Sequence, residues 1–432
     1  MALRKGLFSR FAMSLQYHGT SFLGFSRQPH HEDSILPNGI DLRGYRTVEG
    51  RLRDALFDLL GRMRTRVQHR QPRNSAKSRF EDGTAVSAPF DDDDDGGDGG
   101  DDEEYDNYNY IDNDIPLFEN IQVSSRTDRG VHALHNTLHV DILNRPDGKV
   151  WSPQSLHHGL NFHLSRQGRR TRFDGQSTQN PNWQHHSSPR MDSLEFARVS
   201  LMNEMRVLNV QEAPPFMENP YCGQGSSSVS ATTSQPARVD WNARFSATER
   251  TYLYRILHST TCTVDRHWGV PFEWDRSWRI HKPLNLSAMQ EAAAFLHGTH
   301  DVSSFRTAGC QRSSPVVTLF EVSLHTQPYG PAGIDITSDK NTKDGTRSGL
   351  LHMIPHPPLD SLLLTTIVLR GDAFVYRQVR NMVGCLVAVG MGQMDAQAVP
   401  ALLAGRDRRR APAMAPAHGL FLARVRHGEF NF

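Results

Sequence analysis

The chain has 432 residues, enough for two ordinary domains or one large one with a sizeable core. Its 48 Lys and Arg nearly balance 47 Asp and Glu, but 13 of those acids lie in the window Asp91–Asp114, which has no Lys or Arg, so the other 408 positions carry a formal +14. This basic remainder excludes an acidic enzyme body and favours nucleic acid over a membrane as partner, since no apolar run reaches the roughly 18 residues of a spanning helix.

The N-terminal half shows alternating strand and helix patterns. Apolar side chains alternate over Phe11–Tyr17, which predicts a half-buried strand. Thr47 is expected to cap a helix, because apolar residues recur at helical spacing over 48–60. Alternation returns at Ile121–Val123 and again over 138–142, which predicts two further strands.

Four stretches show neither the alternation of a strand nor the spacing of a helix, and they are expected to be inserts or linkers. Residues 72–116, which include the acidic window, are too rich in Ser, Gly and Asp to bury apolar surface and are predicted to be a disordered insert. A polar insert is expected at 166–190, a linker or insert at the domain boundary over 211–238, and a loop at 327–360. Between the first two, Ser152-Pro153 is expected to cap and open a helix.

The C-terminal half repeats this mixture. A strand is predicted at Tyr252–Ile256, a helix capped by Ser287 and reaching Leu296 follows, and core strands are expected at Val316–Leu324 and Leu362–Leu369. Apolar residues at helical spacing over 376–386 predict a helix that ends near Gly390.

Strands and helices therefore interleave in both halves without the strict alternation of a doubly wound parallel sheet. This pattern favours an α+β fold built from two similar layers. We expect an N-terminal subdomain over 1–210 and a C-terminal subdomain over 239–432, joined by 211–238.

The first segment that could carry chemistry, Ser124–Ala133, lies between two predicted strands. Within it, Asp128 is followed two positions later by Gly130, which is the usual composition of a simple turn. The alternative is a catalytic loop, because Arg126 stands two positions before the carboxylate and loops above rigid strands commonly present catalytic groups.

Two more segments allow a structural and a functional interpretation. Tyr252 and Tyr254 fit the aromatic face of a strand equally well without any ligand. Arg377 and Arg380 stand three positions apart, on one face of the predicted helix, and arginines beside an apolar stripe usually reach into solvent. The sharper alternative is a buried arginine that faces a carboxylate.

In combination, these segments resemble the TruA-type tRNA pseudouridine synthases, and within them most closely the animal tRNA pseudouridine synthase-like 1 group. Six motifs occur in the order typical of that family, over about residues 11–425. The matching segments are Leu15–Gln28, Ser125–Ala133, Phe245–Tyr254, His300–Phe305, Phe374–Gly384 and Ala415–Leu422.

The resemblance implies the pseudouridine synthase fold: two similar α/β subdomains that share an extended, mostly antiparallel sheet with a central basic cleft. It implies isomerisation of uridine to pseudouridine in RNA, with Asp128 as the catalytic carboxylate. On the same basis Arg380 pairs with Asp128, Tyr252 packs on the target base, and Arg126 approaches the nucleotide and assists its extrusion. The reaction changes neither redox state nor atom count, so no cofactor is expected.

The sequence leaves open whether Asp128 attacks carbon or removes a proton from the sugar. In either case the carboxylate must be ionised, and burial opposes ionisation unless a cation is near. Two positions depart from the family pattern. Arg129 stands where a small residue is usual, and Phe25 stands where bacterial members commonly have tryptophan.

The expected partner is tRNA, with other RNA left open, and a homodimer is expected from the resemblance alone. The phosphates of the RNA would bind the basic surface of the protein without sequence specificity. Runs of arginine at Arg408–Arg410, at Arg169-Arg170 and over Arg62–Arg70 are candidate contacts, although such runs are often only solvated surface.

Other functional classes remain as alternatives. The first is a catalytically inactive RNA-binding protein of the same fold, which would be expected to have lost Asp128, Tyr252 or Arg380. The second is a hydrolase built on Asp128 and a histidine, for which no further nucleophile is found. A metal site is not expected, because His297 and His300 have no third ligand at a credible spacing.

Four cysteines, each at least 40 positions from the next, form neither a disulfide scaffold nor a C-x-x-C motif. They favour a reducing, intracellular location. The basic start, which has no acid before Glu32, weakly resembles a transit peptide, so a mitochondrial location is expected alongside cytoplasm or nucleus as alternatives.

Overall fold

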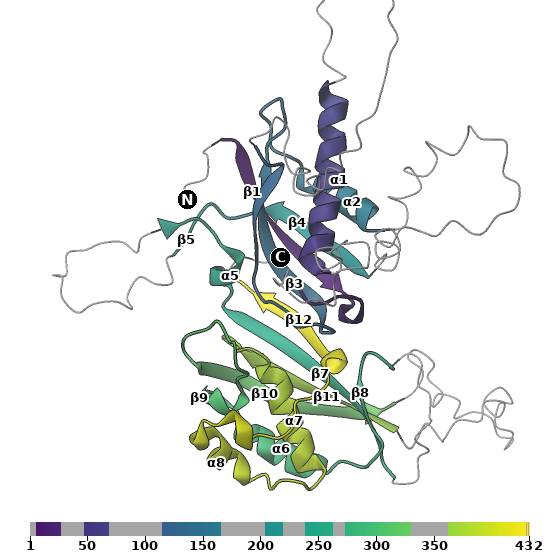
Figure 1. Cartoon of the computed structure of the whole chain (residues 1–432), viewed down its shortest axis with the longest axis vertical. Helices are drawn as coiled ribbons and strands as arrows, with labels where there is room; N and C mark the ends of the chain where they lie inside the picture. The colour runs from purple at the N-terminus through teal and green to yellow at the C-terminus, as the bar shows by residue number, and fades with distance from the viewer. Residues whose placement is uncertain are drawn as a thin grey trace, which may run out of the picture.

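The protein is described here by a computed structural model, in which most strands join one ten-stranded sheet along the length of the molecule (Figure 1). A mixed sheet with few helices confirms the α+β prediction. The structure describes residues 6–26, 47–68, 115–165, 204–218, 238–261, 273–329 and 362–428, with Phe430 and Phe432.

The N-terminal part of the sheet is antiparallel. Strand β1 (Phe8–Tyr17) lies between β4 (Met205–Glu212) and β3 (His132–Leu143), and β2 (Phe118–Val123) pairs with the far end of β3. Over Phe11–Tyr17 only Gln16 is exposed, so β1 is buried on both faces and the expectation of a half-buried strand is wrong. Three of these strands were predicted from the sequence. The exception is β4, whose last two residues enter the stretch at 211–238 that carries no periodicity.

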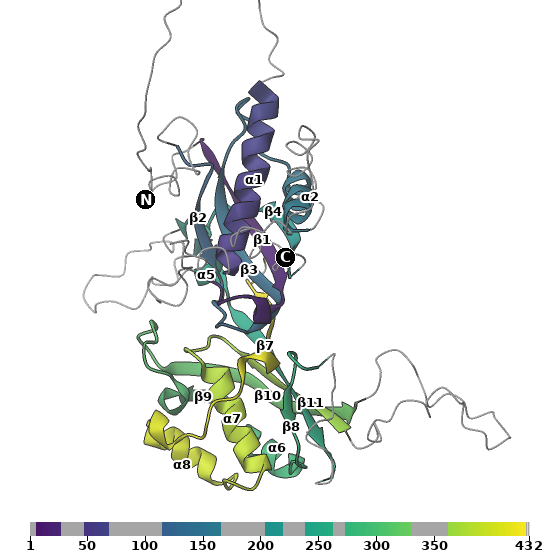
Figure 2. The ribbon, with the colours of Figure 1, turned by 45° about the vertical axis from the view of Figure 1, so that its right-hand side comes forward.

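Helices α1 (Val48–Gln68) and α2 (Pro153–Leu164) pack together over one face of these strands (Figures 1 and 2). Thr47 caps α1 as predicted, because its Oγ1 accepts a hydrogen bond from the amide of Gly50 at 3.0 Å. Ser152 takes the N-cap position of α2, but its hydroxyl donates to the side chain of Gln154 instead of capping the helix.

The C-terminal part of the sheet contains the remaining predicted strands. Strand β7 (Glu249–Ser259) pairs with β11 (Leu362–Gly371), which pairs with β10 (Val316–Pro328), and β9 (Gly298–Asp301) follows at the edge. All these pairs are antiparallel, whereas β8 (Trp278–Ile280) runs parallel to β7.

The larger helices of this half are α6 (Leu286–Ala294), α7 (Gln378–Gly390) and α8 (Ala398–Gly405), which gather in the lower half of Figure 1. The predicted cap of α6 at Ser287 is wrong. Asn285 is the cap, with its Oδ1 accepting from the amide of Ala288 at 3.1 Å, so the helix begins one residue before Ser287.

Strand β12 (Leu420–Arg426) connects the two halves of the sheet. It runs parallel to β3 on one side and antiparallel to β7 on the other. The smaller elements are β5 (Met217–Glu218), β6 (Arg238–Val239), α5 (Ala243–Ser246) and the 3₁₀ turns Gly19–Ser21, Ser303–Phe305, Arg408–Arg410 and Ala417–Gly419.

One hydrophobic cluster reaches from α1 and α2 to α7 and α8, so both halves share a continuous core. Helix α7 is its most buried element, and a Cβ at Gly384 would collide with the carbonyl of Ala413. Most of the expected inserts at 72–116, 166–190, 211–238 and 327–360 lies outside the described residues. Within the described ranges, no helix has both the length and the apolar content needed to cross a bilayer.

Candidate active site

The loop between β2 and β3 is a tight turn that presents a carboxylate. The amide of Val131 donates to the carbonyl of Asp128 at 3.1 Å, and Gly130 has φ of 79°, a conformation that favours glycine. The turn therefore forms as the composition predicts. It does not exclude the functional interpretation, because the side chain of Asp128 is left available for other contacts.

Two arginines from the distant α7 region approach that carboxylate. Nη1 of Arg380 lies 3.5 Å from Oδ2 of Asp128, and Nε of Arg377 lies 3.9 Å from the same oxygen. The side chain of Arg380 is 11% exposed and is anchored by a hydrogen bond from its Nε to the carbonyl of Ala415 at 2.8 Å. The structure thus brings together Asp128 and Arg380, which are 252 positions apart in sequence.

Arg377 does not lie on the face of α7 as expected. It precedes the helix in the left-handed conformation, with φ of 61°, which non-glycine residues adopt rarely. Because the chain turns sharply here, an arginine outside the helix and one in its first turn both face Asp128. Strained backbone of this kind is common at functional sites.

The surroundings of Asp128 favour its protonated form more than those of an ordinary aspartate do. Burial raises the pKa of the Asp128 carboxyl, and the charges of Arg380 and Arg377 lower it without cancelling that effect. Burial likewise lowers the pKa of Arg380, while Asp128 raises it. The expected cations are present, but burial remains the larger influence on Asp128.

Tyr252 lies beside the same loop on β7. Its hydroxyl and the Ser125 hydroxyl share a 2.8 Å hydrogen bond, and its ring meets the ring of Phe374 edge-on at 4.9 Å. The residue is 7% exposed, and burial raises the pKa of the Tyr252 phenol. The ring is therefore held between the loop that carries Asp128 and the segment that leads to α7.

Arg126 is placed differently. It is exposed, and its Nη1 donates to Oε1 of Gln311, a residue of the C-terminal half, at 3.1 Å. Within the described part of the chain it forms no ion pair with Asp128. Arg129, the departure from the family pattern, is also exposed. Both arginines thus face solvent beside Asp128.

The loop that carries Asp128 is also held by hydrogen bonds from residues to which the sequence assigned no role. The hydroxyls of Tyr17 and Thr127 are 2.8 Å apart, and Nδ2 of Asn136 donates to Tyr17 Oη at 3.1 Å and to the Ser125 carbonyl at 2.8 Å. Asn136 is fully buried. A polar side chain at an apolar position of the β3 alternation was the signal that could have revealed it.

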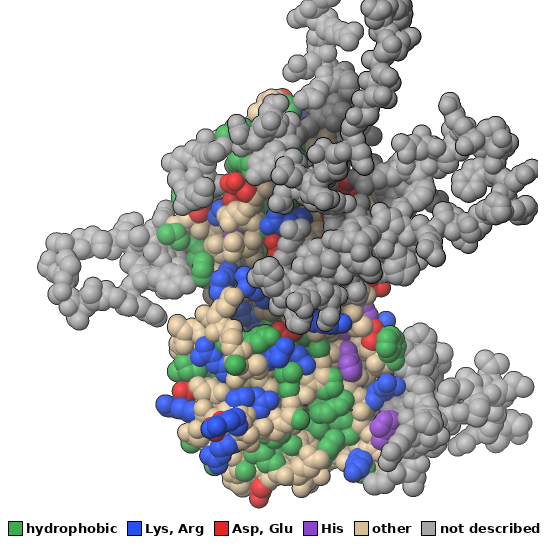
Figure 3. Space-filling model, in the orientation of Figure 1, with side chains coloured by type: hydrophobic (Ala, Val, Ile, Leu, Met, Phe, Trp, Pro, Cys, Tyr) green, Lys and Arg blue, Asp and Glu red, His purple; other side chains and the backbone are tan. Residues whose placement is uncertain are grey.

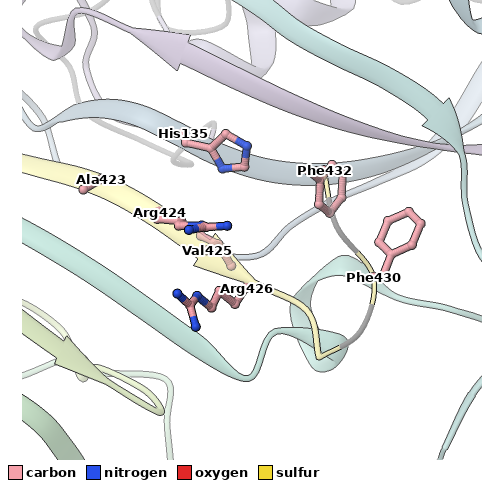
Figure 4. Close-up of a pocket in the computed structure, with 7 residues that line it drawn as sticks. All are labelled: His135, Ala423, Arg424, Val425, Arg426, Phe430 and Phe432. Carbon is pink, nitrogen blue, oxygen red and sulfur yellow. The ribbon is translucent and has the colours of Figure 1, made fainter.

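Basic side chains on the surface and one cavity lie outside the Asp128 loop. Figure 3 shows Lys and Arg side chains spread over the lower half and around the junction of the halves. A cavity of about 320 Å³ between β3, β12 and the C-terminal residues is lined in part by His135, Arg424, Arg426, Phe430 and Phe432 (Figure 4). Its lining does not include the Asp128 site. No three potential metal ligands come together among the described residues.

Comparison with known proteins identifies similar sequences. The family described as tRNA pseudouridine synthase matches residues 292–427. Mouse tRNA pseudouridine synthase-like 1 is 30% identical over 312 residues, which cover 72% of this chain and 78% of the mouse protein. The human protein of that name is 30% identical over 313 residues, or 72% and 75% of the two chains. For tRNA pseudouridine synthase A of Nitratidesulfovibrio vulgaris, identity is 36% over 206 residues, or 46% and 67%.

Proposed function

Because this chain belongs to the tRNA pseudouridine synthase family, we propose that it isomerises uridine to pseudouridine in tRNA. The reaction breaks the bond from C1′ of the ribose to N1 of uracil, rotates the base and forms a bond from C1′ to C5. The hydrogen on C5 leaves as a proton, and N1 gains one, so the atoms balance without a cofactor. The observation that carries the proposal is the placement of Arg380 3.5 Å from Asp128 within a chain of this family.

Asp128 is proposed as the catalytic group. Its ionised carboxylate would act beside the ribose, either as a nucleophile or as a base. Arg380 is the proposed partner that favours ionisation, and Arg377 adds a second, more exposed positive charge. The proposed role of Tyr252 is to pack its ring against the target base.

The nucleotide must leave the base stack before it can reach Asp128, at a cost of a few kcal/mol. Arg126 is proposed to assist this extrusion, which its exposed position beside Asp128 supports. The basic composition outside 91–114, with exposed arginines at 126 and 129, supports a basic cleft between two similar subdomains as the RNA path.

The proposal extends to the assembly of the protein, the limits of its subdomains and its location. We infer subdomains at 1–210 and 239–432 around 211–238, with a homodimer as the assembly. The proposed location is intracellular, with the mitochondrion, the cytoplasm and the nucleus as the alternatives.

The alternative of an inactive RNA-binding protein is less favoured. Asp128, Tyr252 and Arg380 are all retained and lie around one loop, which RNA binding alone does not require. The two functions separate in a simple assay. Uridine labelled with tritium at C5 in tRNA should release its label to water during isomerisation, whereas binding alone releases none. Absence of release from every tRNA pool tested would favour the binding protein.

The pKa of Asp128 predicts the pH dependence. Because its pKa in the folded protein is raised, the carboxylate loses its charge at a higher pH than the value of about 4 typical of aspartate. Activity should therefore fall as pH drops through that raised pKa, at a higher pH than for an ordinary aspartate. A rate profile of single-turnover tritium release between pH 4 and 8 measures this. An acid limb at or below pH 4 would contradict the prediction.

Replacing Tyr252 with phenylalanine should have a modest effect. The ring and its contact with Phe374 remain, and the main loss is the 2.8 Å hydrogen bond to Ser125. One such bond contributes about 1 kcal/mol, so we expect kcat to fall about fivefold. Tyr252→Ala, which also removes the ring, should reduce kcat by about 100-fold or more. Equal losses for the two variants would contradict a role for the ring.

A further inference from the structure

Arg250 is an arginine of β7 that lies two positions before Tyr252 and has an unusual environment. Its exposure is intermediate, and burial lowers the pKa of its guanidinium. Within the described residues it forms no ion pair within 4.0 Å, so the usual reason for placing an arginine away from water is missing there. Its contacts are instead with main-chain carbonyls.

The guanidinium donates to carbonyls from three separate segments. Nη1 donates to the carbonyl of Asp372 at 2.7 Å and to that of Ala247 at 3.0 Å. Nη2 donates to the carbonyl of Ser124 at 3.2 Å and to that of Arg244 at 3.4 Å. Two of these segments lead to the site: one to the loop of Asp128, the other to the first turn of α7.

Both of these carbonyls belong to residues that are fixed by other contacts. Ser124 donates its hydroxyl to the Ala243 carbonyl at 2.8 Å and its amide to the Thr137 carbonyl at 2.9 Å. Asp372 donates its amide to the Thr318 carbonyl at 3.1 Å, and its Oδ1 accepts from the Thr318 amide at 2.9 Å. Arg250 therefore connects two anchored points of the framework.

We infer that Arg250 is a positioning residue, which fixes the loop of Asp128 relative to the segment that carries its arginine partners. The inference rests on the proposed function. Asp128 belongs to the β2–β3 loop and Arg380 to α7, and β2 is not paired with β11, the strand that precedes α7. By binding Ser124 and Asp372, the single side chain of Arg250 supplies a direct link, beside the contacts that Tyr252 makes with Ser125 and Phe374.

Arginine suits this task better than lysine. Its planar guanidinium sends donors in fixed, diverging directions, so one side chain can bind two segments at once. A lysine ammonium keeps the charge but concentrates its donors on one atom. Arg250→Lys should therefore loosen the link while leaving a cation in place, which makes it the informative variant.

The test compares Arg250→Lys with a matched control, Arg51→Lys. Arg51 of α1 likewise donates to a main-chain carbonyl, that of His163 at the end of α2, and neither helix carries a residue proposed to act on the nucleotide. For Arg250→Lys we expect kcat of tritium release from C5-labelled tRNA to fall at least tenfold, with KM and RNA affinity unchanged within twofold. The control should keep kcat within twofold, even where its Tm falls equally.

A second measurement does not need turnover. Hydrogen exchange at the amides of Ser124, Val131 and Asp372, all bonded in the native structure, should accelerate several-fold in Arg250→Lys and remain unchanged in the control. Wild-type protein that releases no tritium would count against the proposed function. Unchanged exchange at these amides in Arg250→Lys would count against the positioning role.

Three further outcomes would overturn the inference. The first is a wild-type kcat in Arg250→Lys, and the second is an equal loss of kcat and RNA affinity, which would indicate a phosphate contact. The third is an Arg250→Lys variant that stays unfolded at every temperature at which the wild type is active. Arg250 would then stabilise the fold as a whole.

Discussion

Replacing Asp128 with asparagine is expected to reduce pseudouridine formation by about 10³-fold or more. Asparagine keeps the size of the side chain but cannot act as the nucleophile or base that the reaction needs. Affinity for tRNA should be retained, since the exposed arginines proposed to contact the phosphates are unchanged. Tritium release at saturating tRNA measures the first quantity, and filter binding measures the second.

The same substitution should not weaken the fold. The pKa of Asp128 is raised in the folded state, so the folded protein binds the proton more tightly than the unfolded chain does. The stability that this contributes is present at low pH and is lost as pH rises through the raised pKa. At neutral pH, Asp128→Asn should therefore have a Tm at or above that of the wild type.

A matched control separates chemistry from charge. Asp147 is also a partly exposed aspartate beside an arginine, 3.3 Å from Arg145, in the turn after β3. Asp147→Asn should leave kcat within twofold of the wild type. Retention of more than about one tenth of the activity by Asp128→Asn would contradict the proposed catalytic role.

Replacing Arg380 with methionine is expected to lower kcat by about 100-fold. The substitution removes the largest charge effect that opposes protonation of Asp128, so the pKa of that carboxyl should rise further. The Ala415 carbonyl would also lose the 2.8 Å hydrogen bond that orients the guanidinium. The acid limb of the rate profile should shift upward, and part of the activity should return at higher pH.

Two comparisons sharpen this result. Arg380→Lys retains a cation but cannot reproduce both contacts, so its kcat should lie between those of the wild type and Arg380→Met. Arg377→Gln removes a guanidinium that lies farther from Asp128, at 3.9 Å, and has 36% side-chain exposure. It should cause a smaller loss and a smaller shift of the acid limb. A larger effect for Arg377→Gln would reverse the assigned order of the two arginines.

Local patterns in the sequence predicted much of the fold. Alternation identified β1, β3 and β7, and apolar composition predicted β10 and β11 as core strands, because each of the five has a face against the shared core. The helical stripe likewise located α1 and α7. Caps were less predictable, since serine and asparagine both accept a hydrogen bond from a helix amide, and only the three-dimensional path of the chain selects Asn285 over Ser287.

The site was predictable in part only. Proximity of Asp128 and Arg380 came from the family resemblance, because no local pattern can relate residues 252 positions apart. The left-handed conformation of Arg377 and the contacts of Arg250 were not predictable, since both depend on carbonyls and loops brought together by the whole sheet. Asn136 did leave a local signal, a polar residue among apolar ones.

The central place of β12 has a consequence for truncated polypeptides. This strand lies C-terminal to every other strand of the large sheet, yet it is inserted between β3 and β7. A stop codon just upstream of Leu420 would spare Asp128, Tyr252 and Arg380 but would leave two partial sheets with unpaired inner edges. Such a product should be inactive and prone to aggregate, so a stop codon at this point should cause a complete loss of function.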